Sequence, residues 1–124
     1  MHKGLGIALI LACLPVQMVM MSEPVSAQTA SDQKAKADRL FQQGIQQYQI
    51  SQFESALQSW EQALTIYRAI KDRLGEGAAL GNLGSAYHSL GKYDKAIEFQ
   101  LQRLAIAREI KDRQIGRASC RERV

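Results

Sequence analysis

Apolar side chains recur at intervals of three and four residues through two stretches of the chain. The apolar positions are Phe53, Ala56, Leu57, Trp60, Ala63, Leu64 and Tyr67 in the first stretch, and Tyr93, Ala96, Ile97, Leu101 and Leu104 in the second. This spacing places the apolar residues on one side of an α-helix, so both stretches are predicted to be amphipathic helices. A further helix is predicted before each of them, at about residues 32–50 and 75–90.

Short segments with capping residues separate the predicted helices. Ser51 is followed three residues later by Glu54, which is the spacing of a capping box: Ser51 accepts from the first turn of the helix and Glu54 bonds back. Gly91 is predicted to end the third helix in the left-handed conformation, which glycine adopts at low cost. Residues 28–114 contain no proline, so nothing interrupts the helices.

The chain also repeats itself with a period of 40 residues. The segment Ile70-Lys71-Asp72-Arg73 recurs as Ile110-Lys111-Asp112-Arg113. Other pairs at the same offset include Leu40 with Leu80, Gly44 with Gly84, Ala56 with Ala96, Leu64 with Leu104 and Arg68 with Arg108. A period of this length is typical of repeat arrays, in which each unit buries its apolar face against its neighbours. The predicted fold class is therefore all-α, built from helix pairs.

The repeated residues resemble those of a known family. Leu83, Gly84, Tyr87, Gly91, Tyr93, Ala96 and Leu104 resemble the tetratricopeptide-repeat signature, and the first copy retains Gly44, Phe53, Ala56, Trp60, Ala63 and Leu64. The repeat is longer than the usual length of about 34 residues and is similar to the extended variant of the family. The resemblance implies antiparallel helix pairs stacked as a short right-handed solenoid, with repeats at about residues 34–73 and 74–114. The small residues Gly44, Gly84, Ala56 and Ala96 are expected where two helices cross.

The N-terminal residues are predicted to be a signal peptide. Residues 4–21 carry no charge, and Val25-Ser26-Ala27 provides small residues for cleavage after Ala27. The mature chain would then begin at Gln28, followed by a short polar linker over residues 28–33, and would be periplasmic or extracellular. Two alternatives stay open. The apolar run is barely long enough to be a membrane anchor, and Cys13 follows a sequence that resembles a lipoprotein box.

The last ten residues, 115–124, abandon the repeat pattern. They match one reading frame of a common sequencing adapter, so we interpret them as an artefact and expect the natural protein to continue beyond Gln114. The repeat register requires a Gly-Glu-Gly linker at the position where Ile115-Gly116-Arg117 stands. The alternative is a short basic tail of solvated arginines.

Charge and composition exclude several classes of function. The whole chain has a formal net charge of +4, but residues 28–114 hold 12 basic residues interspersed with 10 acidic residues. No basic stripe suited to nucleic acid is formed. That segment contains no cysteine and one histidine, His88, so no catalytic triad or zinc site is predicted. The glycine clusters lack the lysine of a phosphate loop, so no cofactor and no catalytic residue are predicted.

The family resemblance implies a scaffold for protein–protein interaction. Arrays of this kind are expected to hold a peptide on the concave face made by the first helix of each repeat. The candidate residues are Asn82, Ser85, His88 and Ser89 in the second copy, beside Ala78, and Gln42 and Gln49 in the first copy, beside Phe41 and Ile45. Asn82 is the strongest candidate, because its amide can donate to and accept from a peptide backbone. The alternative is that these repeats precede a catalytic domain of a longer enzyme, such as a CHAT caspase-like peptidase.

Overall fold

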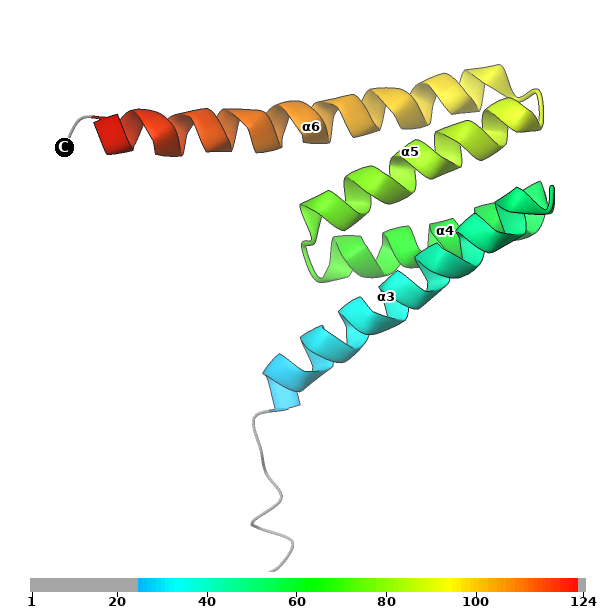
Figure 1. Cartoon of the computed structure of the whole chain (residues 1–124), viewed down its shortest axis with the longest axis horizontal. Helices are drawn as coiled ribbons and strands as arrows, with labels where there is room; N and C mark the ends of the chain where they lie inside the picture. The colour runs from blue at the N-terminus through cyan, green and yellow to red at the C-terminus, as the bar shows by residue number, and fades with distance from the viewer. Residues whose placement is uncertain (1–24, 123–124) are drawn as a thin grey trace, which may run out of the picture. The chain divides into compact units, whose positions relative to one another are not determined.

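The computed structural model describes the backbone of residues 25–122 and the side chains of residues 29–121. Within these residues there are four α-helices: α3 (Val25–Gln49), α4 (Phe53–Ala69), α5 (Arg73–Ser89) and α6 (Tyr93–Glu122) (Figure 1). Contacts divide the chain into two compact units, residues 1–31 and residues 32–124. Of the first unit, the structure describes only the start of α3. The side-chain packing discussed in the following paragraphs is therefore that of the second unit. The predicted all-α fold class is confirmed.

Three turns of the same geometry join the four helices. In each turn one residue has a positive φ: Ser51 at 63°, Lys71 at 58° and Gly91 at 73°. In the last turn the N–H of Gly91 donates to the carbonyl of His88 at 2.9 Å, and the N–H of the following residue donates to the carbonyl of Tyr87 at 2.9 Å. These two bonds form a Schellman motif, and they confirm the role predicted for Gly91.

The capping box predicted at Ser51 is wrong. Ser51 is the left-handed residue that follows α3, and Gln52 stands at the N-cap of α4 with no side-chain hydrogen bond to the helix. The reason lies in the length of the turn. Three residues separate the two helices, so the left-handed position falls one residue before the N-cap and one serine cannot fill both. At the next turn Asp72 does cap α5, because its Oδ1 accepts from the N–H of Gly75 at 3.1 Å.

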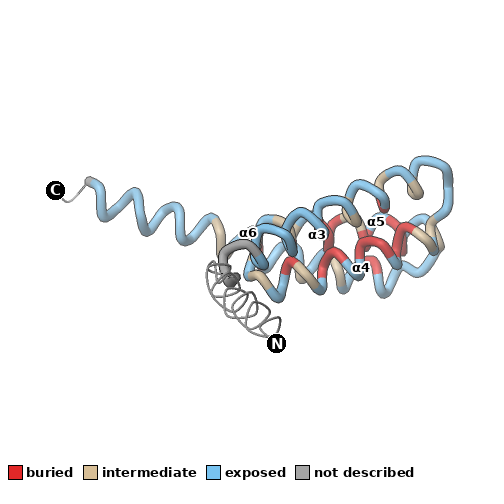
Figure 2. The backbone as a smooth tube through the Cα atoms, turned by 90° about the horizontal axis from the view of Figure 1, so that it is seen from below, coloured by how far each residue is buried: buried red, intermediate tan, exposed pale blue. Residues whose placement is uncertain are grey.

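The core lies along α4 and α5, as the buried segments in Figure 2 show. Trp60, Leu80 and Leu83 are the largest fully buried side chains. The indole of Trp60 lies against Gly44 of α3, where an added Cβ would come within 2.4 Å of the ring nitrogen. The Trp60 Nε1 donates to the carbonyl of Phe41 at 3.1 Å, so the ring is fixed by packing and by a hydrogen bond. Most residues assigned to the repeat signature are buried, among them Gly44, Ala56, Trp60, Leu83, Gly84, Tyr87 and Ala96, whereas Gly91, Tyr93 and Leu104 are exposed.

The outer helices extend further than the sequence suggests. Residues 28–33, interpreted as a linker, belong to α3, and residues 115–122 of the C-terminal tail continue α6. The side chains of residues 111–121 are all exposed, and Figure 2 shows this part of α6 running past the other helices. No helix packs on this segment among the described residues. The backbone therefore keeps its intrahelical hydrogen bonds rather than adopting a left-handed turn at Lys111, which would cost free energy in a lysine.

The N-terminal predictions fall mostly outside the described residues. The apolar run and Cys13 lie within residues 1–24, and Ala27, the predicted cleavage residue, lies in the first turns of α3. Among the described helices, none combines the length and the apolar character needed to cross a bilayer.

A polar cluster ties the start of α5 to α3 and α4. The Lys34 Nζ donates to Asp72 Oδ2 at 2.9 Å, and Lys34 also lies 3.5 Å from Asp38. The Tyr67 hydroxyl donates to Asp38 Oδ1 at 2.6 Å. The hydrogen bond from Lys34 lowers the pKa of Asp72 below its ordinary value of 3.8, more than burial raises it. Burial, followed by the hydrogen bond to Asp38, raises the pKa of Tyr67.

Acid should therefore weaken the fold through Asp72. The pKa of the Asp72 carboxyl is lower in the folded chain than in the unfolded chain. Its charged form therefore stabilises the fold at pH values above its ordinary pKa of 3.8. That contribution is lost as the pH falls through the lowered pKa. We expect the melting temperature to decline below about pH 4, and Asp72→Asn to flatten the decline because asparagine still caps the helix. Thermal melting across this range is the measurement, and an unchanged acid dependence in Asp72→Asn would contradict the assignment.

Candidate functional site

Two rows of side chains, one on α3 and one on α5, form a mostly uncharged face. The rows are Asp38, Gln42, Ile45 and Gln49 on α3, and Ala78, Asn82, Ser85 and Ser89 on α5. Intervals of four, three and four residues place each row on one side of its helix. Every member is exposed or half-buried. We refer to these eight residues as the α3–α5 face.

Contacts at both ends hold the two helices side by side and set their direction. Near the N-terminal ends Lys34 pairs with Asp72, and near the C-terminal ends the Tyr48 and Ser89 hydroxyls lie 2.8 Å apart. Because the contacts join start to start and end to end, α3 and α5 run in the same direction. The two rows therefore lie in matching register, offset by one 40-residue period.

Asn82 lies at the middle of the α5 row. It is half-buried, and its amide makes no hydrogen bond to any described residue. An amide offers two donor hydrogens and one acceptor oxygen. Asn82 can therefore donate to and accept from the same peptide group of a ligand.

The two serines of the row bond to their own helix. Ser85 Oγ donates to the carbonyl of Gly81 at 3.1 Å, and Ser89 Oγ lies 3.1 Å from the carbonyl of Ser85. The hydroxyl of Ser89 is also bonded to Tyr48. Ser85 thus retains acceptor capacity for a ligand, whereas Ser89 mainly joins α5 to α3.

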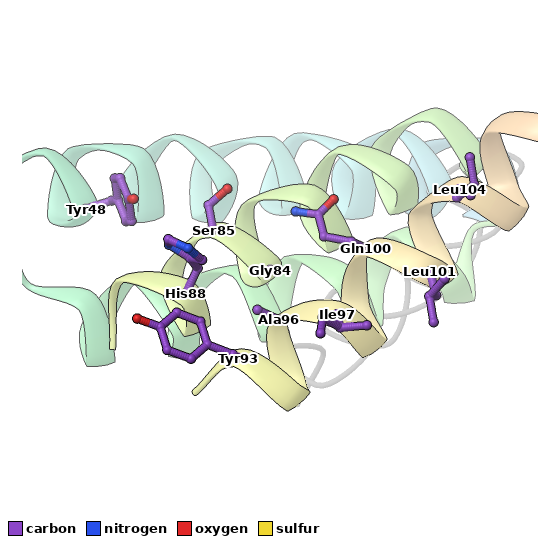
Figure 3. A pocket seen from close by; sticks show the side chains of 10 residues that line it. All are labelled: Tyr48, Gly84, Ser85, His88, Tyr93, Ala96, Ile97, Gln100, Leu101 and Leu104. Carbon is purple, nitrogen blue, oxygen red and sulfur yellow. The ribbon is translucent and has the colours of Figure 1, made fainter. Parts of the chain in front are cut away.

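Beside the α3–α5 face, a groove of about 650 Å³ runs between α5 and α6 (Figure 3). Its walls are Tyr48 of α3, Gly84, Ser85 and His88 of α5, and Tyr93, Ala96, Ile97, Gln100, Leu101 and Leu104 of α6. No aspartate, glutamate, lysine or arginine lines it. The ring of His88 meets that of Tyr93 edge-on, with centroids 5.2 Å apart. Apart from His88 and the hydroxyl and amide groups, the groove offers a ligand apolar surface.

The structure does not gather the predicted site residues into one pocket. Ser85 and His88 both line the groove, while Asn82 and Ser89 lie on the adjacent face. Gln42 borders a separate hollow on α3, and Gln49 is exposed near the end of that helix. The sequence identified the α5 residues and missed the α6 wall of the groove. The signal was the apolar spacing of Tyr93, Ile97, Leu101 and Leu104, which predicts the apolar side of an amphipathic helix but does not show that this side is exposed, as all four residues are.

A chain of alternating charges lies where α4, α5 and α6 meet. Arg68 and Arg73 both pair with Glu76, at 3.0 and 2.7 Å, and Glu109 of α6 pairs with Arg73 and Arg113. The hydrogen bond from Arg73 lowers the pKa of Glu109, against a smaller opposing effect of burial. Glu76 is buried and fully paired, so this cluster fastens three helices together. Among the described residues, no group of three or more metal-ligating side chains is found.

Comparison with known protein families identifies the family of this helical arrangement. The family model of the tetratricopeptide repeat matches residues 44–109, which is more than half of the chain. The chain belongs to the tetratricopeptide repeat family. Tetratricopeptide repeats are in general scaffolds for protein–protein interaction, and the four stacked antiparallel helices are consistent with that fold. No curated protein matches the chain at a significant level.

Proposed function

We propose that this tetratricopeptide unit is an exported scaffold, without catalysis of its own, that binds a protein partner as a peptide across the α3–α5 face. The observation that supports this most is the amide of Asn82, half-buried at the centre of the face and without a hydrogen-bond partner among the described residues. Placing such a group where it loses part of its hydration is unfavourable unless a ligand can restore the lost bonds.

The chemistry of the face favours a peptide backbone over a charged ligand. Asn82 and Ser85 on α5, with Gln42 and Gln49 on α3, are neutral groups that donate and accept hydrogen bonds. Asp38 is the one charged member of the face. His88 lies at the boundary with the groove, where it can contact a side chain of the partner. Neutral groups distributed in this way suit main-chain N–H and C=O groups, and they give little affinity for nucleic acid phosphates.

Replacing Asn82 with alanine should weaken partner binding about tenfold, which corresponds to about 1.4 kcal/mol and is the usual scale for one or two hydrogen bonds. The partner is first captured with the mature chain, and its affinity for each variant is then measured by calorimetry. Gln58→Ala is the matched control, since Gln58 is an exposed amide on α4, away from the face. Equal losses in both variants, or capture of nucleic acid in place of protein, would contradict the proposal.

Export is the second part of the proposal. The uncharged run of residues 4–21 and the small residues before Gln28 support a signal peptide over residues 1–27. Mass spectrometry of the protein secreted by a bacterial host should give a chain that begins at Gln28. An acylated chain that begins at Cys13 would favour the lipoprotein alternative and would tether the scaffold to a membrane.

We also propose that residues 115–124 are not native and that a further repeat of the extended 40-residue type follows Gln114. Glu76 is buried between two arginines, and its equivalent one period later is Gly116, which carries no carboxylate. Position 115 is the equivalent of Gly75, which must be small because it lies against the ring of Tyr67. One period later the ring is replaced by the smaller Ala107, so the need for glycine at position 115 is a weaker argument than the missing carboxylate at position 116.

Sequencing the native gene tests this part directly. An acidic residue at position 116 and an apolar helix after it would support the continued repeat. A frame that encodes the present residues to a stop after Val124 would contradict it. A native frame that reaches a histidine–cysteine catalytic domain would favour the alternative of a longer enzyme.

A further inference from the structure

A carboxylate is held in a fixed place at one end of the α3–α5 face. The Tyr67 hydroxyl donates to Asp38 Oδ1 at 2.6 Å. Tyr67 is 3% exposed, and its ring meets that of Phe41 edge-on and lies against Gly75. A ring packed in this way cannot follow the carboxylate, so the hydrogen bond keeps Asp38 in one position. The Asp38 side chain is nevertheless 51% exposed, so a ligand can reach it.

The negative charge of Asp38 is only partly neutralised. Lys34 Nζ lies 2.9 Å from Asp72 Oδ2 and 3.5 Å from Asp38 Oδ1. The hydrogen bond to Asp72 is the largest cause that raises the pKa of Lys34 above its ordinary value of 10.5. One ammonium group therefore faces two carboxylates, and the Tyr67 hydroxyl is a neutral donor. Asp38 Oδ2 has no hydrogen-bond partner among the described residues.

No second cation pairs with Asp38 in the part of the chain that the structure describes. The other cations of this part of α3 are Lys36 and Arg39, and neither forms an ion pair there. Arg39 borders the same outer hollow as Asp38, but it lies about 100° further round the helix. The other seven members of the α3–α5 face are uncharged. Asp38 therefore decides which sign of charge this face favours in a ligand.

Apolar surface lies at the same end of the face as Asp38. Ala78 is the equivalent of Asp38 one period later, and it is exposed. Leu74 continues the α5 row by one turn beyond Ala78 and is 72% exposed. Lysine and arginine side chains combine an apolar stem with a charged head. Such a side chain can pack its stem on Leu74 and Ala78 and bring its head to Asp38.

We propose that Asp38 makes the α3–α5 face selective for a basic peptide, in which one lysine or arginine packs on Leu74 and Ala78 and pairs with Asp38. This inference rests on the proposed peptide-binding function and adds the chemistry of the partner. A glutamate or aspartate at the same place in the peptide meets the unneutralised carboxylate and is disfavoured.

The position of the basic residue follows from Asn82. Asn82 lies four residues after Ala78, which is about 6 Å along α5 at 1.5 Å per residue. An extended peptide advances about 3.3 Å per residue. The lysine or arginine is therefore expected about two residues away from the peptide group that bonds to Asn82.

Selection from a random peptide library displayed on phage, with the mature chain as bait, tests the proposal. The selected peptides should share a lysine or arginine. Fluorescence anisotropy of one such peptide should show that replacing this residue with alanine weakens binding about two- to fivefold, the scale of an exposed ion pair. Replacing it with glutamate should weaken binding further. The ratio should approach one as NaCl rises from about 0.05 to about 0.5 M, because salt screens exposed charges.

Asp38→Asn supplies the decisive comparison. Asparagine still accepts from the Tyr67 hydroxyl, so the fold is kept, and thermal melting of the variant checks this. In Asp38→Asn the lysine-to-alanine change in the peptide should alter binding by less than about 1.5-fold, because the ion pair is absent. Glu98→Gln is the matched control, since it removes one exposed carboxylate from α6, away from the face, and should leave the preference intact.

The outcomes separate this inference from the function on which it rests. Peptides that bind, and that lose affinity with Asn82→Ala, yet carry no shared basic residue would overturn the inference and leave peptide binding standing. The same result would follow if Asp38→Asn kept the full preference, or if acidic peptides were selected. Selection of no peptide, or binding that is insensitive to Asn82→Ala, would contradict the proposed function and this inference with it.

Discussion

Replacing Trp60 with alanine should abolish the cooperative unfolding transition of this unit. Trp60 is 2% exposed, its indole fills the space above Gly44, and its Nε1 donates to the carbonyl of Phe41 at 3.1 Å. Removing a buried tryptophan costs about 3–5 kcal/mol, and here it also leaves a carbonyl without its donor. Because Gly44 has no side chain that could move into the cavity, the loss should lie at the upper end of that range.

The size of the unit makes this loss decisive. Two repeats share one inter-repeat interface, and small domains have total stabilities at the low end of about 5–15 kcal/mol. Far-UV circular dichroism during heating is the measurement. Gln58→Ala, on the exposed side of the same helix, should stay within about 0.5 kcal/mol of the parent chain. A Trp60→Ala chain that melts cooperatively within a few degrees of the parent would show that the core does not depend on this ring.

Alanine at Gly44 and alanine at Gly84 should have clearly different effects, although the two glycines are equivalent in the repeat. A Cβ at Gly44 would lie 2.4–2.7 Å from three atoms of the Trp60 ring, which is rigid and buried. The ring or the backbone of α3 must then shift, at a cost near the upper end of about 1–3 kcal/mol, which outweighs the gain of about 1 kcal/mol that alanine has over glycine in a helix. We expect the melting temperature of Gly44→Ala to fall by about 10 °C.

At Gly84 the nearest neighbour of an added Cβ is the amide end of Gln100, at 2.6 Å. Gln100 is exposed and flexible, so it can move aside and lose its 3.3 Å hydrogen bond to the carbonyl of Gly81. Alanine in a helix interior also gains about 1 kcal/mol over glycine, which offsets that loss. The expected change in Gly84→Ala is within about 1 kcal/mol of zero. Melting curves of the two variants, measured side by side, check the contrast, and equal losses would refute it.

These two glycines show where sequence reasoning reached its limit. Both were predicted to lie at helix crossings, and both are buried there. Whether the residue opposite is a rigid ring or a movable amide depends on residues 60 and 100, which are Trp60 and Gln100. The repeat locates the crossing, but the partners across it differ from one copy to the next.

The arrangement of the candidate site could be predicted only in part for a similar reason. The spacing of Asn82, Ser85 and Ser89 on one helix placed them on one face, because helix geometry alone fixes that relation. The sequence could not show that Ser89 bonds to Tyr48 of α3, since that contact needs two helices brought together from 41 positions apart. It also could not show that the apolar residues of α6 are uncovered. Helical periodicity marks an apolar side and does not state whether anything lies against it.

The sequence by itself determined the helices, the 40-residue period and the helix pairs, because apolar spacing and turn length are local properties of the chain. Tertiary structure decided the conformation of Ile-Lys-Asp-Arg. In the first copy residues 70–72 form a turn and Arg73 begins α5, whereas residues 110–113 are helical throughout. Four identical residues have the same intrinsic preferences in both places. At residues 70–72 the burial of α5 against α4 stabilises the left-handed conformation of Lys71. At residues 110–113 no described helix packs behind the segment, so the helical conformation has the lower free energy.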